Sequence, residues 1–337
     1  MSASLMAAEL AEAPGAVAAL LADGAALDAA VRAIAARPRP FAVVCGRGSS
    51  GHAGVYFRYL CETLLGCCVV ASAPSIVTAY RRAPRMEGAL FVVISQSGRS
   101  PDLVAATAQA RDAGALTLAL VNDGASPVAG AADLVLALRA GPERSVAATK
   151  TVIASMAACA ALLGRLAGDR ALLAALDRLP ASLDAALALD WAGWTLLLRG
   201  AAAAVVTGRG PGLAAAREIA LKLAETLRLP ALAYSAAELR HGPRAALGAA
   251  TPVLALRQDD AVAATVDALA AELAAAGVPL ALCGGPRGDL PWLAGLHPVL
   301  APVCMLPPAY RAIEAEARRR CLDPDRPPGL AKVTETL

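Results

Sequence analysis

Short apolar runs alternate with longer stretches of helical pattern along the first half of the chain, and this alternation restricts the fold more than any other feature. Apolar runs separated by helices are typical of strands in a parallel sheet that is buried on both faces. The segment from residue 147 to about 199 then reads as alanine-rich helix, with a break at Pro180. The predicted strands are residues 41–45, 67–71, 89–95, 115–121 and 133–138.

The same pattern starts again near residue 203. Segment 203–212 (AAVVTGRGPG) echoes segment 41–51 (FAVVCGRGSSG), and the two Gly-Arg-Gly turns begin 162 residues apart, at 46 and 208. A helix at 211–229 and strands at 231–235, 252–256 and 278–283 follow. A duplicated domain explains this repeat. We therefore predict an α/β fold of two tandem, doubly wound parallel sheets, flavodoxin-like and three-layered (αβα).

A turn of small polar residues follows the third apolar run. Ser95, Gln96 and Ser97 come first, and Ser100 with Pro101 suits the N-cap and first position of a helix. Backbone N–H groups and the helix dipole would converge there on an anion. Taken alone, such a turn is more often an ordinary polar connection. A second polar turn at 46–51 ends the first strand, so the two together predict a site for a phosphomonoester at one edge of the sheet.

Composition excludes several classes of function. The net charge is +3 and aromatic residues make up only 3%, so we expect no nucleic-acid partner. Hydrophobic residues reach 57%, but many are alanine, and we expect no membrane span. Glu9 and Glu12 stand where an export signal would be cationic, so we expect a cytoplasmic protein. The eight cysteines form no C-x-x-C pair, and we expect them reduced, with no metal or cofactor.

The chain contains six notable motifs, CGRGSS (45–50), SQSGRSPD (95–102), ERSVAATKT (143–151), REIALKLAET (217–226), AELRHGP (237–243) and LAKVTE (330–335). Together they resemble the double SIS (sugar isomerase) domain family, and they occur in that family's order. The resemblance is to the isomerase half of glucosamine-6-phosphate synthases and, more closely, to glucosamine-6-phosphate deaminases. It implies an N-terminal helical segment (1–40), a first SIS domain (41–168), linker helices with a second SIS domain (169–320) and a tail over the active site (321–337).

The resemblance also implies roles for individual residues. Glu225 would move the proton between sugar carbons, His241 would assist ring opening from the neighbouring subunit, and Lys332 would form a Schiff base. A homodimer with shared active sites is the implied assembly. The implied substrate-binding residues are Ser50, Ser95, Gln96, Ser97, Ser100, Val146 and Lys222.

Each of these roles has a plainer alternative. Glu218, Lys222 and Glu225 share one helix face opposite an apolar stripe, which is how a solvated ladder of ion pairs looks. His241 precedes Gly-Pro and would then be an exposed turn residue. Lys332 would be a solvated lysine in a proline-rich tail, unless Leu330 and Val333 dock that tail.

The expected function is glucosamine-6-phosphate deamination, in which glucosamine 6-phosphate and water give fructose 6-phosphate and ammonia. One carboxylate can transfer the proton between C2 and C1, and a positioned base contributes about 10² to 10⁴ in rate. No cysteine occurs in residues 1–40, so we expect no glutaminase domain. The alternatives are another phosphosugar aldose-ketose isomerase, a deglycase, a galactosamine-6-phosphate deaminase, or a non-catalytic sugar-phosphate sensor.

Overall fold

A computed structural model of the chain describes residues 3–332 and divides them into two compact units. The first, here the N-sheet unit, comprises residues 15–143, 150–177 and 331–332. The second, the C-sheet unit, comprises residues 3–14, 144–149 and 178–330. Helix α2 (Ala13–Ala22) crosses the boundary between the first segments of the two units.

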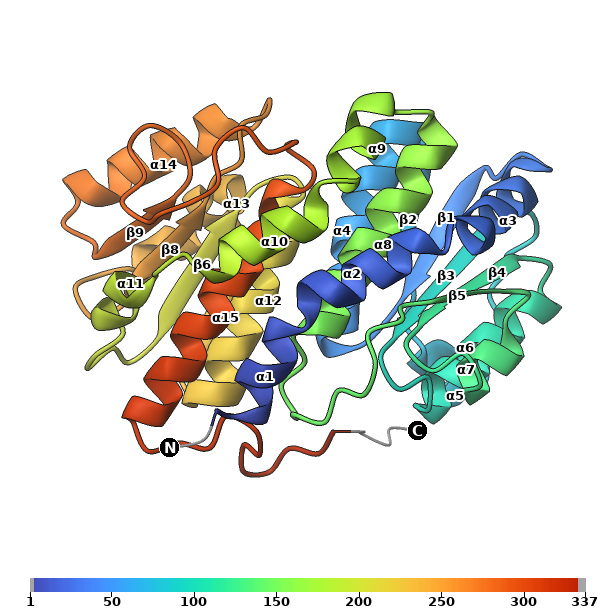
Figure 1. Cartoon of the computed structure of the whole chain (residues 1–337), viewed down its shortest axis with the longest axis horizontal. Coiled ribbons are helices and arrows are strands. Elements are labelled where there is room, and N and C mark those ends of the chain that lie inside the picture. Colours follow the sequence, from blue (N-terminus) through green and yellow to red (C-terminus); the bar gives the residue numbers. More distant parts are fainter. Residues whose placement is uncertain (1–2, 333–337) are drawn as a thin grey trace. The chain divides into compact units, whose positions relative to one another are not determined.

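The N-sheet unit contains a parallel sheet of five strands in the order β2-β1-β3-β4-β5 (Figure 1). All five predicted strands are present, with ends that differ by no more than a residue or two. The central strand β3 is buried along its whole length, as a strand covered on both faces must be. The strands are β1 (Phe41–Cys45), β2 (Cys68–Ala71), β3 (Leu90–Ser95), β4 (Leu116–Val121) and β5 (Leu134–Ala137).

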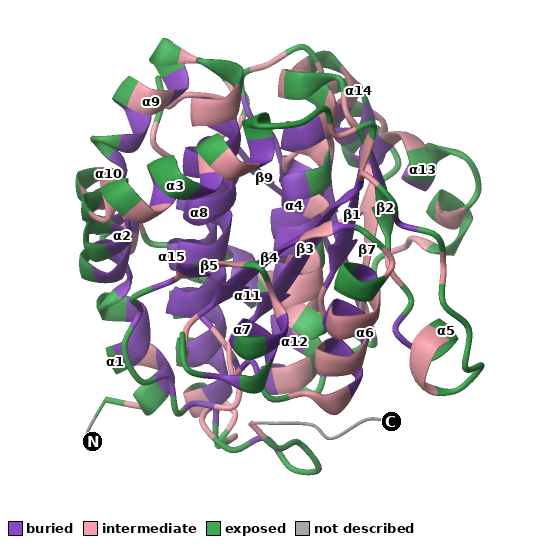
Figure 2. Cartoon of the chain, turned by 90° about the vertical axis from the view of Figure 1, so that its right-hand side faces the viewer, coloured by how far each residue is buried: buried purple, intermediate pink, exposed green. Residues whose placement is uncertain are grey.

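Helices cover both faces of this sheet. On one face, α6 and α7 pack into a core with β1, β3 and β4. On the other face, α4 contacts β1 and β3, and α3 contacts β5. Helix α8 packs against both α3 and α4. Figure 2 shows the buried interior of the sheet and of α8. The helices are α3 (Gly24–Ala35), α4 (Gly48–Leu65), α5 (Ser75–Thr78), α6 (Pro101–Asp112), α7 (Pro127–Ala131), α8 (Lys150–Ala167) and α9 (Arg170–Leu176).

Helix α8 bears on the expectation that the chain has no membrane span. By length and hydropathy it could cross a membrane. Helices α1 (Leu5–Ala11) and α2 pass the same test only when they are taken together as one span bent by 42°. In the structure, however, 83% of α8 is buried. Burial of that extent is typical of a core helix, so its apolar composition is explained by packing and is weak evidence for a span.

The C-sheet unit repeats the architecture with a parallel sheet of four strands in the order β7-β6-β8-β9 (Figure 1). Helix α12 packs on this sheet and against α15, while α13 and α14 contribute to a separate apolar core with the strands. The strands are β6 (Ala204–Gly208), β7 (Ala231–Ser235), β8 (Val253–Leu256) and β9 (Leu280–Cys283). The helices are α1 (Leu5–Ala11), α10 (Leu179–Leu187), α11 (Ala192–Leu197), α12 (Gly212–Leu227), α13 (Ala236–Arg240), the 3₁₀ helix η1 (Pro243–Ala246), α14 (Ala263–Ala275) and α15 (Ala301–Arg319).

The repeated Gly-Arg-Gly turns have the same geometry in both units. A Cβ atom on Gly46 would lie 2.9 Å from the backbone of Ser50, and one on Gly208 would lie 2.6 Å from the carbonyl oxygen of Gly212. In each copy glycine therefore lets the first turn of the helix approach the end of the strand closely. The duplication predicted from sequence is thus present at the level of individual contacts.

Helix α15 is the largest element that the sequence pattern did not predict. Its interior contains Pro307 and Pro308, which remove two backbone donors and normally end a helix. The helix nevertheless persists because it packs along both α12 and α10, and most of its residues are buried. Tertiary packing has overridden local propensity here.

Candidate functional site

Two polar turns lie next to each other at the carboxyl edge of the N-sheet unit. β1 and β3 are neighbouring parallel strands, and the chain leaves them into α4 and α6. Because β2 lies beyond β1, strand order reverses between β1 and β3, which is the usual ligand position in an open α/β sheet. The N-termini of α4 and α6 bring the positive ends of two helix dipoles to this edge.

An ion pair ties the two turns together. Arg47, the N-cap of α4, donates to Asp102 Oδ2 from Nε at 3.0 Å and from Nη2 at 2.7 Å. Asp102 is buried in the first turn of α6, and its other oxygen accepts the Leu103 N–H at 2.8 Å. The Arg47 side chain stays half-exposed, so the pair fixes the spacing of the turns and adds positive charge at their edge.

The predicted serines shape the turn after β3. Ser95 Oγ accepts the Gly98 N–H at 3.0 Å, and Ser97 Oγ accepts the Arg99 N–H at 3.3 Å. Accepting these bonds leaves each hydroxyl its own O–H as a donor. Ser100 is the N-cap of α6 as predicted, although its side chain makes no capping bond. Ser50 and Gln96 are half-buried at the same edge, in α4 and directly after β3.

The matching turn of the C-sheet unit is occupied by its own side chains. Arg257, directly after β8, pairs with Asp259. Gln258 donates to the carbonyl of Arg209, in the second Gly-Arg-Gly turn, at 2.7 Å. The two copies therefore differ in chemistry, and only the N-sheet copy carries the serine turn expected to hold phosphate.

Glu218, Lys222 and Glu225 form a buried cluster on α12, so their interpretation as a solvated ladder is wrong. Their side chains are 0%, 1% and 22% exposed. Lys222 Nζ lies 2.5 Å from Glu225 Oε2 and 3.3 Å from Glu218 Oε1. The covering element is α15, whose Tyr310 donates its hydroxyl to Glu218 Oε1 at 3.0 Å. The helical wheel could not anticipate this cover because α15 itself was not predicted.

The charge of Lys222 is retained inside the protein. Burial alone would lower its pKa, but the attraction of Glu218 and Glu225 is stronger in sum, and the pKa of Lys222 is raised. One ammonium group is thus shared by two carboxylates. Glu225 is the most exposed of the three, so its carboxylate is the part of the cluster that solvent can reach.

Glu225 lines a pocket of about 160 Å³ in the C-sheet unit. The end of α12 forms one side and the segment after α15 forms the other. A cavity of this volume admits a small polar molecule. The lining residues are Glu225, Thr226, Arg228, Cys321, Leu322, Asp323, Arg326, Pro327 and Pro328.

The segment that closes this pocket is fixed by Asp325. Its carboxylate accepts the N–H groups of Leu5 and Met6, at 2.8 and 2.7 Å, at the start of α1. Its carbonyl accepts the Val146 N–H at 3.0 Å. The Val146 N–H thus serves the C-terminal segment, so the predicted contact of Val146 with substrate would have to come from its carbonyl group.

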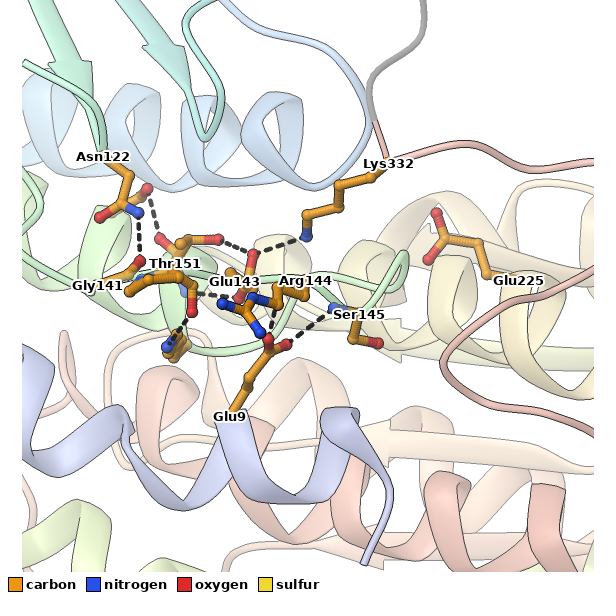
Figure 3. Close-up of polar contacts among 12 residues, drawn as sticks. Glu9, Asn122, Gly141, Glu143, Arg144, Ser145, Thr151, Glu225 and Lys332 are labelled. Atoms are coloured by element: carbon orange, nitrogen blue, oxygen red, sulfur yellow. Dashed lines mark hydrogen bonds and ion pairs between the residues drawn. The ribbon is translucent and has the colours of Figure 1, made fainter. Parts of the chain in front are cut away.

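Lys332 belongs to the N-sheet unit, where it reaches a buried carboxylate (Figure 3). Its Nζ lies 3.1 Å from Glu143 Oε2, and its side chain is 22% exposed. Docking through Leu330 is not observed, because that residue is 47% exposed. Val333, the other residue expected to dock, lies outside the described residues. The tail lysine is therefore held by charge.

His241 lies on a turn, as predicted, at the C-cap of α13. Its backbone N–H donates to Glu238 at 3.0 Å and its side chain is exposed. Its catalytic role remains a prediction.

The structure assigns the predicted site residues to two groups. Ser50, the SQSG turn, Ser100 and Lys332 belong to the N-sheet unit, whereas Val146, Lys222, Glu225 and His241 belong to the C-sheet unit. Sequence reasoning missed Glu143, Glu218 and Tyr310 as site residues. Glu143 begins the ERSVAATKT motif and Glu218 lies in REIALKLAET, so their positions were a usable signal, whereas Tyr310 had none.

Among residues 3–332, no group of three or more His, Cys, Asp or Glu side chains could hold a metal ion.

Comparison with known proteins agrees with this architecture. The SIS domain model matches residues 39–165 and 197–291. The chain belongs to the SIS domain family. It is 35% identical to a glutamine–fructose-6-phosphate aminotransferase (isomerizing) of Symbiobacterium thermophilum, over 86% of the chain and 50% of the relative. It thus spans about half the length of the curated relatives it matches.

Solved structures extend the similarity over nearly the whole chain. A "putative phosphosugar isomerase" from Silicibacter pomeroyi is 38% identical, with a TM-score of 0.91 over 96% of this chain and 100% of that one. A glucosamine-6-phosphate deaminase from Thermotoga maritima is 20% identical, with a TM-score of 0.80 over 99% and 100%. The second match shows a shared fold.

Proposed function

We propose that this SIS protein is a phosphosugar isomerase that acts on glucosamine 6-phosphate as an isomerizing deaminase. The sugar is opened and isomerised to the fructose imine, and water then releases ammonia and fructose 6-phosphate. The names of the similar proteins support phosphosugar chemistry. The reaction needs a phosphate site, a proton-transfer group and a place for the open chain.

The turns after β1 and β3 supply the phosphate site in this proposal. The two helix N-termini and the hydroxyls of Ser95, Ser97 and Ser100 bind the phosphate, and Arg47 adds charge. Because the phosphate is remote from C1 and C2, its binding energy can hold the open chain in a reactive position.

Glu225 transfers the proton between C2 and C1. It removes the C2 proton, the electron pair of that C–H bond forms the C1=C2 bond of the enolamine, and the C1 oxygen takes up a proton from water. The amino nitrogen then gives up a proton to water as the C2=N bond forms, and the C1=C2 electrons take the proton back at C1 from the same carboxyl group. Lys222 stays protonated between Glu218 and Glu225 and holds the carboxylate in place. His241 assists ring opening and, in the homodimer we propose, comes from the neighbouring subunit.

The buried Glu218-Lys222-Glu225 cluster is the observation that carries this proposal. Buried charges are costly, and replacing them with apolar side chains is often neutral or stabilising. A sugar-phosphate sensor would need the phosphate turns but no such cluster beside a pocket. The cluster therefore favours catalysis over sensing.

The test is a substrate panel read in two channels. Purified protein is incubated with glucosamine 6-phosphate, and ammonia and fructose 6-phosphate are measured separately. Equal amounts of both products are expected, with loss of both in Glu225→Gln. If the protein converts another phosphosugar without releasing ammonia, the assigned reaction becomes simple isomerisation instead of deamination. Ammonia or amine release only from galactosamine 6-phosphate or from a glycated amine would reassign the substrate. Binding without any turnover would indicate a sensor.

A further inference from the structure

Lysine is scarce in this chain, and its positions are informative. The chain has 31 cationic side chains, of which only Lys150, Lys222 and Lys332 are lysines. Lys150 is fully buried and donates to the Pro142 carbonyl at 2.7 Å, and Lys222 is buried in the acid cluster. Lys332 is the only lysine among the three with an appreciably exposed side chain. Lys332 is therefore the lysine whose amine a carbonyl compound in solution can reach.

Glu143 provides the carboxylate beside that amine. Its side chain is 0% exposed. It accepts the Thr151 hydroxyl at 2.7 Å on Oε2 and the Thr151 N–H at 3.2 Å on Oε1, while Lys332 Nζ lies 3.1 Å from Oε2 (Figure 3). Thr151 stands in the first turn of α8, so the carboxylate is fixed by a rigid element. Lys332, by contrast, lies in a segment without helix or strand.

We propose that Glu143 is the positioning residue for Lys332, holding its amine in place and relaying its protons when that amine attacks a phosphosugar carbonyl. This inference rests on the proposed function only in taking a phosphosugar as the carbonyl compound. A lysine side chain has a flexible four-carbon stem, and an unattached tail would present it in many conformations. The fixed carboxylate selects one of them.

The relay is balanced in atoms and charge. Glu143 accepts a proton from the ammonium, and the nitrogen lone pair then forms the bond to the carbonyl carbon while the C=O π electrons move to oxygen. Glu143 returns that proton to the oxygen. A second proton passes from nitrogen to the same oxygen by the same route, the C–O bond breaks, and water leaves. The protonated imine on Lys332 keeps the single positive charge of the original ammonium.

Reductive trapping tests this directly. Full-length protein is treated with fructose 6-phosphate and sodium cyanoborohydride, and the modified fraction of Lys332 is followed by peptide mass spectrometry. Glu143→Gln should trap the sugar at least about tenfold more slowly, the usual scale of a lost hydrogen bond to a charged group. Glu143→Asp should recover part of the rate. Affinity for fructose 6-phosphate without reductant should change little, which a merely structural role would not predict.

The control is Asp28→Asn, which removes an exposed partner of Arg165 in the same unit and should trap at the rate of the unmodified protein. If Glu143→Gln does not fold, Thr151→Val removes one of the bonds that fix Glu143 and should slow trapping several-fold. The proposal would be overturned if Glu143→Gln, or Thr151→Val where Glu143→Gln does not fold, trapped the sugar at the same rate as the unmodified protein. Equal slowing in Asp28→Asn would overturn it as well.

The outcomes also separate this proposal from the proposed function. Turnover of glucosamine 6-phosphate without any trapping at Lys332 would refute the role of Glu143 and leave the deaminase standing. Trapping that depends on Glu143 without turnover would support Glu143 and refute the deaminase. Absence of both would refute both.

Discussion

Replacing Lys222 by methionine should destabilise the C-sheet unit strongly. The ammonium group contacts Glu225 at 2.5 Å and Glu218 at 3.3 Å, and the side chains of Lys222 and Glu218 are 1% and 0% exposed. Removing one partner from a buried ion pair costs about 3–5 kcal/mol, whereas an exposed pair is worth about 0–1 kcal/mol. Methionine is of similar length and keeps most of the packing, so the loss should come mainly from the uncompensated Glu218 carboxylate.

The assay is urea unfolding followed by a probe in the C-sheet unit, such as hydrogen exchange in α12 and α15. Arg240→Met is the matched control in the same unit, because Arg240 pairs with Glu272 at 2.5 Å on the surface, and its loss should cost no more than about 1 kcal/mol. In a double-mutant cycle, Glu218→Gln should reduce the cost of Lys222→Met, because the buried charge is then absent. A cost below about 1 kcal/mol for Lys222→Met would show that the cluster is solvated and would refute the reasoning.

Three further predictions concern the two candidate binding regions. Gly98→Ala should weaken phosphosugar binding, measured by calorimetry, because Gly98 has φ +62° and a Cβ there would lie 2.1 Å from Ser126 Oγ. Unchanged affinity would contradict the geometry of the turn. Arg47→Met should raise KM about tenfold with kcat nearly constant, since it loses a charge remote from the reacting carbons, and a fall in kcat alone would contradict this placement. Alkylation of the exposed Cys321, which lines the pocket of Glu225, should block turnover in step with labelling, and the activity of Cys321→Ser should resist the reagent.

The sequence predicted the fold well because its strongest signals were local. Apolar strand runs and glycine turns depend on neighbouring residues, and every predicted strand is present. The repeat of Gly46 at Gly208 was visible as spacing alone, and both glycines make the same close contact with a helix. The local structure of the serine turn was predictable for the same reason, since strand, serines and N-cap are consecutive, whereas its binding of phosphate stays a prediction.

What the sequence could not predict depends on contacts between distant residues. The burial of Lys222 follows from α15, whose two internal prolines concealed a helix about 80 residues further along the chain. Likewise, the contact of Asp325 with the start of α1 joins residues 320 positions apart. No periodicity within one segment reports such a pairing. Lys332 was identified through its motif, whereas its pairing with Glu143, 189 positions earlier in the chain, required the structure.

The central claim is that Glu225 transfers a proton between C2 and C1 of a phosphosugar, and deuterium incorporation measures this step directly. Glucosamine 6-phosphate and fructose 6-phosphate are incubated separately with protein in D₂O. Proton NMR follows exchange at C2 of glucosamine 6-phosphate and at C1 of fructose 6-phosphate. The unmodified protein should exchange these positions, and Glu225→Gln should slow exchange by about 10² to 10⁴ while still binding the sugar. Exchange at an undiminished rate in Glu225→Gln would contradict the assignment of Glu225 as the base.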